Sequence, residues 1–328
     1  MAFTRFNKVK YHLPALLIGL LPGFCVQAAE YPARPVRLIV QFSPGGNVDT
    51  AARVIAKRLS EQMGQQVIVD NRAGAQGSIA YQVLATAPAD GYTLGIGHIG
   101  HLTLNPHTLG KVPYDPLRDF TPISRTVNAP NLLVVHPGVK AASVQELVSL
   151  AKANPGKLAY GTGGVGTVGH LAGELLSQRA GISLLHVPFK GTGLVVPDLL
   201  SGQLQLTFSG PPALLPHVKS GRMRALAITT LKRSSAFPDL PTVAESGFPG
   251  FEAVAWMGLI GPARLSGPVV TKLNREVRAA MDDAGVRSTL GGLGFEIVTS
   301  TPEVFAAYIR SEHALWGKLV KERGIRGE

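Results

Sequence analysis

The pattern that most constrains the fold of this chain is an alternation of short apolar segments with amphipathic helical ones. Apolar or β-branched segments bounded by Gly or Pro occupy residues 36–42, 67–69, 92–96, 132–135, 184–187, 205–208 and 224–228. Helical patterns fill the gaps between them. Strands that alternate with helices in this way form layered α/β structures, so we expect mainly parallel sheets buried between helices.

Several helix boundaries carry sequence signals. Between residues 48 and 63 the apolar positions recur every three or four residues, and Gly64 follows as a C-terminal cap. Residues 143–146 and 242–245 both have the capping-box pattern, which predicts a helix start at each. Thr301 and Pro302 predict the start of the last helix. Its packed face would consist of Phe305, Tyr308, Ile309, Leu315, Trp316 and Leu319.

The length of the chain points to two domains. It has 328 residues, 45% of them hydrophobic and 16% charged, and single cores stop growing below this size. Residues 128–131 and the Pro- and Gly-rich residues 238–251 are candidate linkers. Two crossings insert one domain into the other, so we expect residues 29–128 and 254–328 in domain 1 and residues 129–253 in domain 2.

The first 28 residues have the features of a secretory signal peptide. Three Lys or Arg residues form a basic start, residues 13–21 are apolar, and Ala28 ends a small-residue cleavage site. A lipid anchor on Cys25 is disfavoured because Phe24 before it is too bulky for the usual cleavage site. We therefore expect export to the periplasm and a mature chain without cysteine.

The charge does not indicate a nucleic-acid-binding protein. The leader has three basic residues and no acidic one, so its removal lowers the net charge from +11 to +8. The remaining basic residues are scattered, and aromatic residues make up only 6% of the chain. We expect a solvated basic surface that attracts anions and does not bind nucleic acid.

Two glycine-rich loops each follow a predicted strand and precede a predicted helix. The first is FSPGGNVD at residues 42–49, and the second is GTGGVGT at residues 161–167. A helix N-terminus leaves about four N–H groups without partners, and glycine lets an anion approach them closely. The first loop alone is equally consistent with a tight turn capped by Asp49. With the second loop it suggests two anion-binding cradles that face each other.

Other kinds of site are disfavoured. Gly161, Gly163 and Gly166 fit a dinucleotide fingerprint, but His186 stands where an acidic residue would bind a ribose. Two histidines three residues apart, at His98 and His101, with His107 beyond them, are more often polar lining than metal ligands. The common hydrolase, metalloprotease and P-loop motifs are absent from the sequence. We expect no cofactor, no metal and no catalysis.

Eight motifs in a fixed order resemble one known family. They read YPARPVRLIVQFSPGGNVDTAARVIAKRL, GQQVIVDNRAGAQGSIA, DGYTLGIG, VPYDPLRDFTPIS, NPGKLAYGTGGVGTVGHLAGEL, HVPFKGTG, LLPHVKSGRMRALAIT and FPDLPTVAESGFPGFE. They closely resemble the Bug (TctC-like) receptors, the periplasmic solute-binding proteins of tripartite tricarboxylate transporters. The likeness runs from Tyr31 to Ile325.

The resemblance implies a fold and a site. The fold would be a Venus-flytrap of two α/β domains, of the type II periplasmic binding protein kind, that closes on a small carboxylate without catalysis. Backbone amides of both glycine-rich loops and ordered water would hold one carboxylate. The matching positions are Ser43, Pro44, Gly45, Gly46 and Asp49, facing Thr162, Gly163, Gly166 and Thr167. Asp49 is expected to fix its loop by bonding backbone N–H groups.

Departures from the family pattern bear on the ligand. His101 stands where members often have a small hydroxyl residue, and Ser209 and Gly210 stand where they often have an acid or amide. The ammonium group of an amino acid would have no partner there. We therefore expect a non-amino di- or tricarboxylate or an aromatic acid, with His98, His101 and Ser209 as candidate contacts for its far end.

The resemblance also implies partners. We expect a monomer that makes transient contact with the permease subunits of a tripartite tricarboxylate transporter. A periplasmic adaptor that presents its liganded form to a signalling protein is compatible with the same residues, whereas an exported enzyme is disfavoured.

Overall fold

The computed structural model describes residues 1–4, 31–42, 44, 47–189, 192–234 and 236–326. Residues Tyr31–Glu328 form one compact unit, distinct from residues Met1–Glu30. The unit Tyr31–Glu328 is built on two sheets. The predicted signal peptide lies almost entirely outside the described residues.

The first sheet has six strands in the order β11-β4-β10-β3-β1-β2. They are β1 (Val36–Val40), β2 (Val67–Asn71), β3 (Thr93–His98), β4 (Phe120–Pro130), β10 (Val254–Pro262) and β11 (Glu296–Ile297). β1 pairs in parallel with β2 and β3, whereas β10 runs antiparallel to β3 and β4. The carboxyl ends of β1 and β3 therefore lie at one edge of this sheet.

The second sheet has five strands in the order β7-β6-β8-β5-β9. They are β5 (Leu132–Val135), β6 (Ala159–Thr162), β7 (Leu185–Pro188), β8 (Leu206–Ser209) and β9 (Arg224–Ile228). β6 is parallel to β7 and β8, and β5 is antiparallel to β8 and β9. The expectation of mainly parallel sheets is wrong, because β4, β5, β9, β10 and β11 pair only with antiparallel neighbours. Three of them, β4, β5 and β10, begin or end where the chain passes between the sheets, so a helical crossover does not set their direction.

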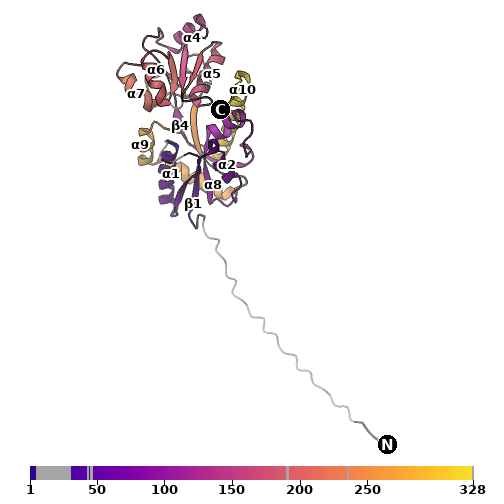
Figure 1. Ribbon diagram of the computed structural model, residues 1–328. Helices are drawn as coiled ribbons and strands as arrows, with labels where there is room; N and C mark the ends of the chain where they lie inside the picture. Colours follow the sequence, from indigo (N-terminus) through magenta and orange to yellow (C-terminus); the bar gives the residue numbers. More distant parts are fainter. Residues whose placement is uncertain (5–30, 43, 45–46, 190–191, 235, 327–328) are drawn as a thin grey trace. The chain divides into compact units, whose positions relative to one another are not determined.

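Helices cover both sheets (Figure 1). Around the first sheet lie α1 (Asn47–Met63), α2 (Ser78–Ala85), α3 (Asn105–Thr108), α8 (Gly267–Asp282), α9 (Ala284–Gly292) and α10 (Pro302–Arg323), with the short turns η1 (Ala75–Gly77) and η2 (Gly100–Leu104). Around the second lie α4 (Val144–Ala153), α5 (Val168–Ala180), α6 (Val195–Leu200) and α7 (Pro211–Lys219), with η3 (Thr192–Leu194).

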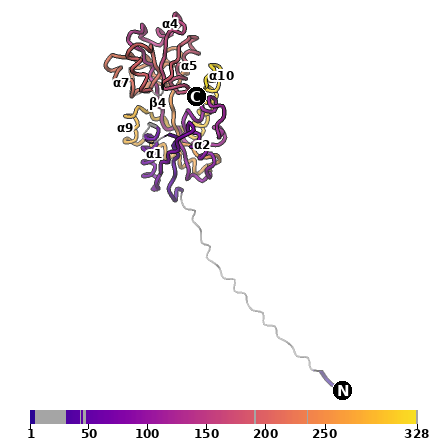
Figure 2. The backbone as a smooth tube through the Cα atoms, in the orientation of Figure 1, coloured from indigo at the N-terminus to yellow at the C-terminus, as the bar shows by residue number. Residues whose placement is uncertain are grey.

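The chain passes between the sheets twice. It leaves the first sheet where β4 ends at Pro130 and returns where β10 begins at Val254. In Figure 2 the intervening residues are magenta to salmon, whereas the chain before them is indigo to purple and the chain after them is orange to yellow. The two predicted domain boundaries lie at these passages, and the assignment of residues 29–128 and 254–328 to one domain and 129–253 to the other stays a prediction.

One apolar cluster continues from one sheet to the other. It contains Leu133 of β5, Leu171 of α5, Trp256 of β10 and Trp316 of α10, all less than 1% exposed. The predicted face of the last helix is confirmed, since its six side chains are buried in this cluster or packed against it. Burial of such large side chains stabilises a fold by about 1.5–3 kcal/mol each.

The helix-boundary predictions have mixed outcomes. Gly64 ends α1 with a φ of +66°, and Thr301 caps α10 by accepting from Val304 N at 3.3 Å. Thr242 and Glu245 make both capping-box bonds, at 2.9 and 3.1 Å. The predicted helix start at Thr242 is nevertheless wrong, because turns follow it and Gly247, at φ +94°, cannot continue a helix.

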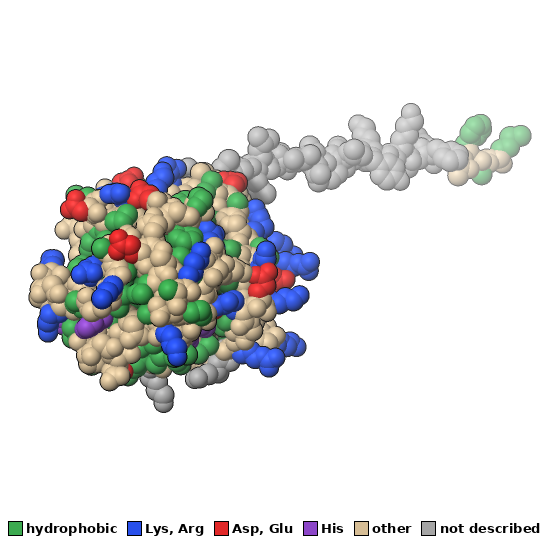
Figure 3. Space-filling view, turned by 90° about the horizontal axis from the view of Figure 1, so that it is seen from above, with side chains coloured by type: hydrophobic (Ala, Val, Ile, Leu, Met, Phe, Trp, Pro, Cys, Tyr) green, Lys and Arg blue, Asp and Glu red, His purple; other side chains and the backbone are tan. Residues whose placement is uncertain are grey.

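The surface of the described residues shows mixed charges. On the face in Figure 3, Lys and Arg side chains lie among acidic, apolar and uncharged ones. Within the described part of the chain, no helix combines the length and hydrophobicity needed to span a membrane.

Candidate functional site

The first glycine loop joins β1 to α1. Ser43, Gly45 and Gly46 lie outside the described residues, and Pro44 is exposed in a turn. The helix begins directly after this loop at Asn47. The N–H groups of the first turn of α1 therefore follow directly on the loop, which is the arrangement that an anion-binding cradle requires.

Asp49 anchors the start of α1 to β2. Its side chain is 3% exposed, and Oδ2 accepts from Arg53 Nε at 3.0 Å. Asn71 Nδ2 donates both to Asp49 Oδ1 and to the carbonyl oxygen of Phe42, each at 2.9 Å. Since Phe42 directly precedes the loop, the carboxylate helps to fix the entry to the loop, and Arg53 balances its charge.

His98 and His101 lie beside this entry. The ring of Phe42 meets both imidazoles edge-on, with ring centroids 5.3 and 5.4 Å apart, and the two imidazole centroids are 5.5 Å apart. His101 is 5% exposed and stacks on Tyr81 at 5.0 Å. A Cβ at Gly77 would lie 2.0 Å from His101 Nε2, so glycine is required where this backbone covers the imidazole.

Both histidines are neutral at ordinary pH. Burial lowers the pKa of His98 to about 4. Burial, and then the His98 ring, lower the pKa of His101 to about 3. His101 Nδ1 is buried and has no hydrogen-bond partner among the described residues. A buried polar atom of this kind is a candidate contact for a polar group of a ligand.

The second glycine loop is held by its two threonines. Thr167 caps α5 by accepting from His170 N at 3.4 Å and donates to the carbonyl oxygen of Gly164 at 2.8 Å. Thr162, fully buried at the end of β6, donates to the same carbonyl at 3.2 Å. Because α5 begins at Val168, its first-turn N–H groups are those that a helix leaves without internal acceptors.

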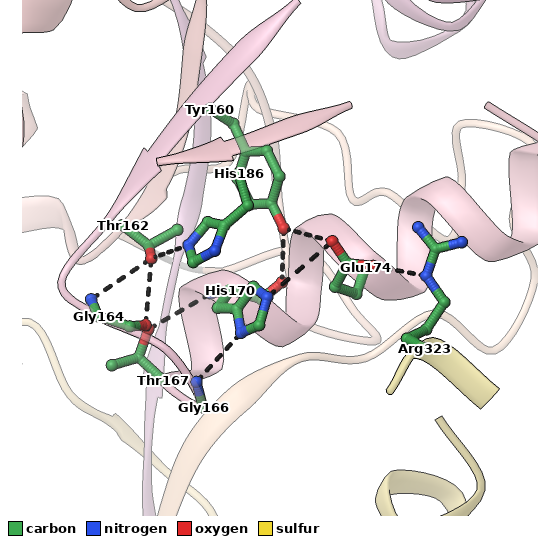
Figure 4. Close-up of polar contacts among 9 residues, drawn as sticks. All are labelled: Tyr160, Thr162, Gly164, Gly166, Thr167, His170, Glu174, His186 and Arg323. Atoms are coloured by element: carbon green, nitrogen blue, oxygen red, sulfur yellow. Dashed lines mark hydrogen bonds and ion pairs between the residues drawn. The ribbon is translucent and has the colours of Figure 1, made fainter. Parts of the chain in front are cut away.

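The N–H of Gly166 has a partner that the sequence did not suggest. It donates to His170 Nδ1 at 3.1 Å (Figure 4). Gly166 has a φ of +74°, a conformation that side-chain-bearing residues rarely adopt. His170 therefore sets the direction of a backbone donor that we expected to meet the ligand directly.

A buried polar network continues behind His170. Its ring stacks on His186, with centroids 3.9 Å apart and planes 15° apart, and a 2.7 Å hydrogen bond joins His186 Nε2 to Thr162 Oγ1. On the other side, Glu174 Oε1 lies 4.0 Å from His170 Nε2 and accepts from Tyr160 OH at 2.8 Å.

The network reaches α10, because Arg323 Nε donates to Glu174 Oε2 at 2.5 Å (Figure 4). Gln178 of α5 also donates to Glu322 of α10. These contacts connect the second glycine loop to a helix that packs on the first sheet. The spacing of His170 and Glu174, four residues apart on one helix face, was an available signal. No local pattern could have indicated Arg323.

Ser209 lies beside the second loop at the end of β8. Its Oγ shares a 2.9 Å hydrogen bond with Thr207 Oγ1, which donates to the carbonyl oxygen of Gly161 at 2.8 Å. A Cβ at Gly169 would lie 2.3 Å from the carbonyl oxygen of Phe208, so only glycine lets α5 begin this close to β8.

The structure thus gathers the candidate residues into two groups. One consists of Asp49, His98 and His101 around Phe42; the other consists of Thr162, Gly163, Gly166, Thr167 and Ser209. His107 lies elsewhere, with its Nε2 3.0 Å from the carbonyl oxygen of His313. Within the described ranges no three His, Cys, Asp or Glu side chains are placed to share a metal ion. That one ligand joins the two groups stays a prediction.

The fold and these helix-terminal glycine loops define a class of protein, the α/β solute-binding proteins of the periplasm. Within this class, the chain belongs to the tripartite tricarboxylate transporter family receptors, whose family model, TctC, matches residues 51–325. This is a family of receptors rather than of enzymes. The expected resemblance and the expected fold class, a two-domain Venus-flytrap of type II, are confirmed.

Two curated relatives match most of the chain. A UPF0065 protein in the tcbD-tcbE intergenic region of Pseudomonas sp. (strain P51) is 39% identical, over 89% of this chain and 87% of the relative. Protein BugT of Bordetella pertussis is 37% identical, over 92% of this chain and 93% of the relative.

Solved structures of similar proteins include two with carboxylates. R. palustris Rpa4515 with adipate has a TM-score of 0.72 and 38% identity, covering 90% of this chain and 99% of that one. MatC from Rhodopseudomonas palustris with bound malate has a TM-score of 0.68 and 32% identity, covering 88% and 100%. The periplasmic binding protein BugD has a TM-score of 0.68 and 33% identity, covering 91% and 100%.

Proposed function

We propose that this receptor captures a small carboxylate in the periplasm and delivers it to the membrane subunits of a tripartite tricarboxylate transporter. The observation that carries the proposal is the geometry of the loop before α5. The hydroxyl groups of Thr162 and Thr167 both donate to the carbonyl oxygen of Gly164 within the loop, and the loop leads directly into the first turn of α5, whose N–H groups are hydrogen-bond donors. Helix N-termini with such donors favour anions. The relatives with adipate and malate support a carboxylate as that anion.

The charges around the loops favour an acid without an amino group. Asp49 is paired with Arg53, and Glu174 is paired with Arg323 behind the second loop. Ser209 offers a hydroxyl where an acidic residue would be needed to bind an ammonium group. The ligand class that fits best is a non-amino di- or tricarboxylate or an aromatic acid, with one carboxylate at the glycine loops.

The first group of residues would meet the remainder of the ligand. Phe42 presents an apolar ring edge, and His98 and His101 present neutral imidazoles. Neutral imidazoles discriminate by hydrogen bonding and shape rather than by charge. In this proposal the backbone donors read the carboxylate, and these side chains select among carboxylates.

The experiment is a thermal-shift screen followed by calorimetry. The panel contains adipate, malate, citrate, benzoate, glutamate and the diamide of adipate. We expect at least one non-amino acid to raise the melting temperature, because a ligand that binds only the folded state stabilises it by about 2.7 kcal/mol at a hundred times its dissociation constant. The diamide should bind at least about tenfold worse, a loss of about 1.4 kcal/mol.

A matched pair of variants tests the site. Gly163→Asp puts a carboxylate within the second loop and should abolish binding, since each charge-assisted hydrogen bond lost costs about 1.5–3 kcal/mol. Gly267→Asp is the control, because a Cβ at Gly267 meets nothing within 4 Å at the start of α8. Unchanged affinity in folded Gly163→Asp would refute the proposed site. Preference for glutamate over every non-amino acid would refute the ligand class.

A further inference from the structure

The bond between Gly166 and His170 defines the protonation state of the imidazole. Gly166 N–H donates to His170 Nδ1, so Nδ1 must carry a lone pair and the ring must be neutral with its proton on Nε2. His170 is the third residue after the cap of α5, the position from which a side chain commonly reaches back to a loop N–H. The plainest role of His170 is therefore that of a helix-capping residue.

The surroundings of His170 favour more than capping. The titratable groups that face it are His186 from β7, Tyr160 from β6, Glu174 from its own helix and Arg323 from α10. Burial lowers the pKa of His170, and Arg323 adds to this, whereas Glu174 opposes it. Glu174 thus lies where it can stabilise an imidazolium if another anion joins it.

We propose that His170 takes up a proton when a carboxylate binds at the second glycine loop, so that capture of the anion is linked to pH. The proposal rests on the proposed function, because it needs an anion at residues 163–167. It assigns His170 as a positioning residue that determines whether the Gly166 N–H turns inward or toward the ligand.

The reason is the number of donors that meet at one point. Protonation of Nδ1 replaces the acceptor of the Gly166 N–H with a second donor directed at the same place. Two facing donors repel each other unless they share an acceptor, and a carboxylate oxygen supplies one with a full negative charge. The bound anion and the proton on His170 therefore stabilise each other, and by linkage each raises the affinity for the other.

The stacked imidazole of His186 limits the uptake to one proton. The rings of His170 and His186 lie face to face at 3.9 Å, so two adjacent positive charges would repel strongly. Burial first, and then the neighbouring His170, lower the pKa of His186 to about 4. His186 therefore remains neutral, and its Nε2 remains bonded to Thr162.

The sign of the linkage follows from the direction of the change. Binding raises the pKa of His170 from a lowered value, so the affinity for a carboxylate rises as the pH falls toward 6. A binding step that takes up one full proton changes the dissociation constant tenfold per pH unit. We expect the dissociation constant of the probe to fall about fivefold or more between pH 8 and pH 6, where the probe acids stay ionised.

The experiment is calorimetry with adipate and malate at pH 6, 7 and 8, in buffers of different ionisation enthalpy, which gives the number of protons taken up. His170→Asn places a neutral amide near the position of Nδ1, and His170→Gln is a second non-titrating variant. The control is His136→Asn, because His136 Nδ1 also accepts a glycine N–H, that of Gly138, at the same 3.1 Å but away from the glycine loop.

The expected result is proton uptake in the wild type and in His136→Asn, and pH-independent binding without proton uptake in the His170 variants. Binding without proton uptake in the wild type, or uptake that persists in a His170 variant, would overturn this proposal alone. Failure of every acid in the carboxylate panel to bind would overturn the proposed function and this inference with it. If neither variant folds, the ¹⁵N shift of Nδ1 in the wild type decides: protonation on adding adipate at pH 6 supports the proposal, and no change overturns it.

Discussion

Glu312 offers the clearest test of how burial controls charge in this protein. Its side chain lies between β10 and α10, and its Oε2 accepts from Trp256 Nε1 at 3.3 Å and from Trp316 Nε1 at 2.8 Å. Burial raises the pKa of Glu312 from 4.5 to about 7, and the nearby charge of Glu252 adds to the shift, while the indole donors oppose it. The folded state therefore retains a proton that the unfolded chain has already lost.

The consequence is a loss of stability with rising pH. Between the unfolded and folded pKa values, from about 4.5 to about 7, the folded state binds more protons than the unfolded state, so this group's contribution falls as the pH rises. At 1.36 kcal/mol per pKa unit, the full loss is about 3 kcal/mol. Glu312→Gln keeps an acceptor for the indoles without the charge. The difference in unfolding free energy between Glu312→Gln and the wild type should therefore shift in favour of the variant by about 2–3 kcal/mol between pH 5 and pH 8.

Urea denaturation of both proteins at pH 5 and pH 8 measures this difference. The chain has two tryptophans, and both donate to Glu312, so their fluorescence reports unfolding and should also titrate near pH 7 in the native wild type. The control is Glu303→Gln in the first turn of α10. Backbone hydrogen bonding lowers the pKa of Glu303, so its effect should be constant between pH 5 and 8. An equal effect of Glu312→Gln at both pH values would refute the reasoning.

Two further predictions concern the site. His101→Ala should alter the ranking of affinities among the acids of the panel more than it weakens all of them, because its unpaired Nδ1 and its contact with Phe42 lie beside the first loop rather than at the second; a uniform drop measured by calorimetry would assign His101 to structure. Arg323→Ala removes a cation that lowers the pKa of His170, so the pH at which affinity begins to rise should move upward. An unchanged pH profile of the dissociation constant would show that Arg323 of α10 does not influence proton uptake.

The sequence predicts the parts of the fold that local patterns determine. All seven apolar segments form strands, since their length, apolar character and flanking Gly or Pro depend on nearby residues. β4, β10 and β11 are not among the predicted segments, and β4 contains two prolines, Pro122 and Pro130. The strand tolerates Pro122 because the residue opposite it, Ile260, lies at a register shift in β10, where a missing N–H costs little.

The candidate site divides in the same way. The glycine loops could be located because a strand, glycines and a helix follow one another in sequence. The bond from Gly166 to His170 is also local, but nothing in the sequence states which way the imidazole turns. The ion pair of Glu174 with Arg323 spans 149 residues, so only the packing of α10 against α5 determines it.

The two groups of residues differ in chemistry. We assign selection among carboxylates to the group around Phe42 and binding of the anionic group to the second loop. Around Phe42 the imidazoles are buried and held neutral, with pKa values of about 4 for His98 and about 3 for His101, so they stay uncharged across the range in which the receptor would work. Behind the second loop, His170 faces a carboxylate within 4.0 Å and can become charged when an anion arrives. On this assignment, we expect changes at His101 to reorder the affinities of the acids and leave proton uptake unchanged. We expect changes at His170 to remove proton uptake and leave the order of the acids unchanged. A variant on either side that altered both properties together would mean that the two groups act as one site with a shared charge balance.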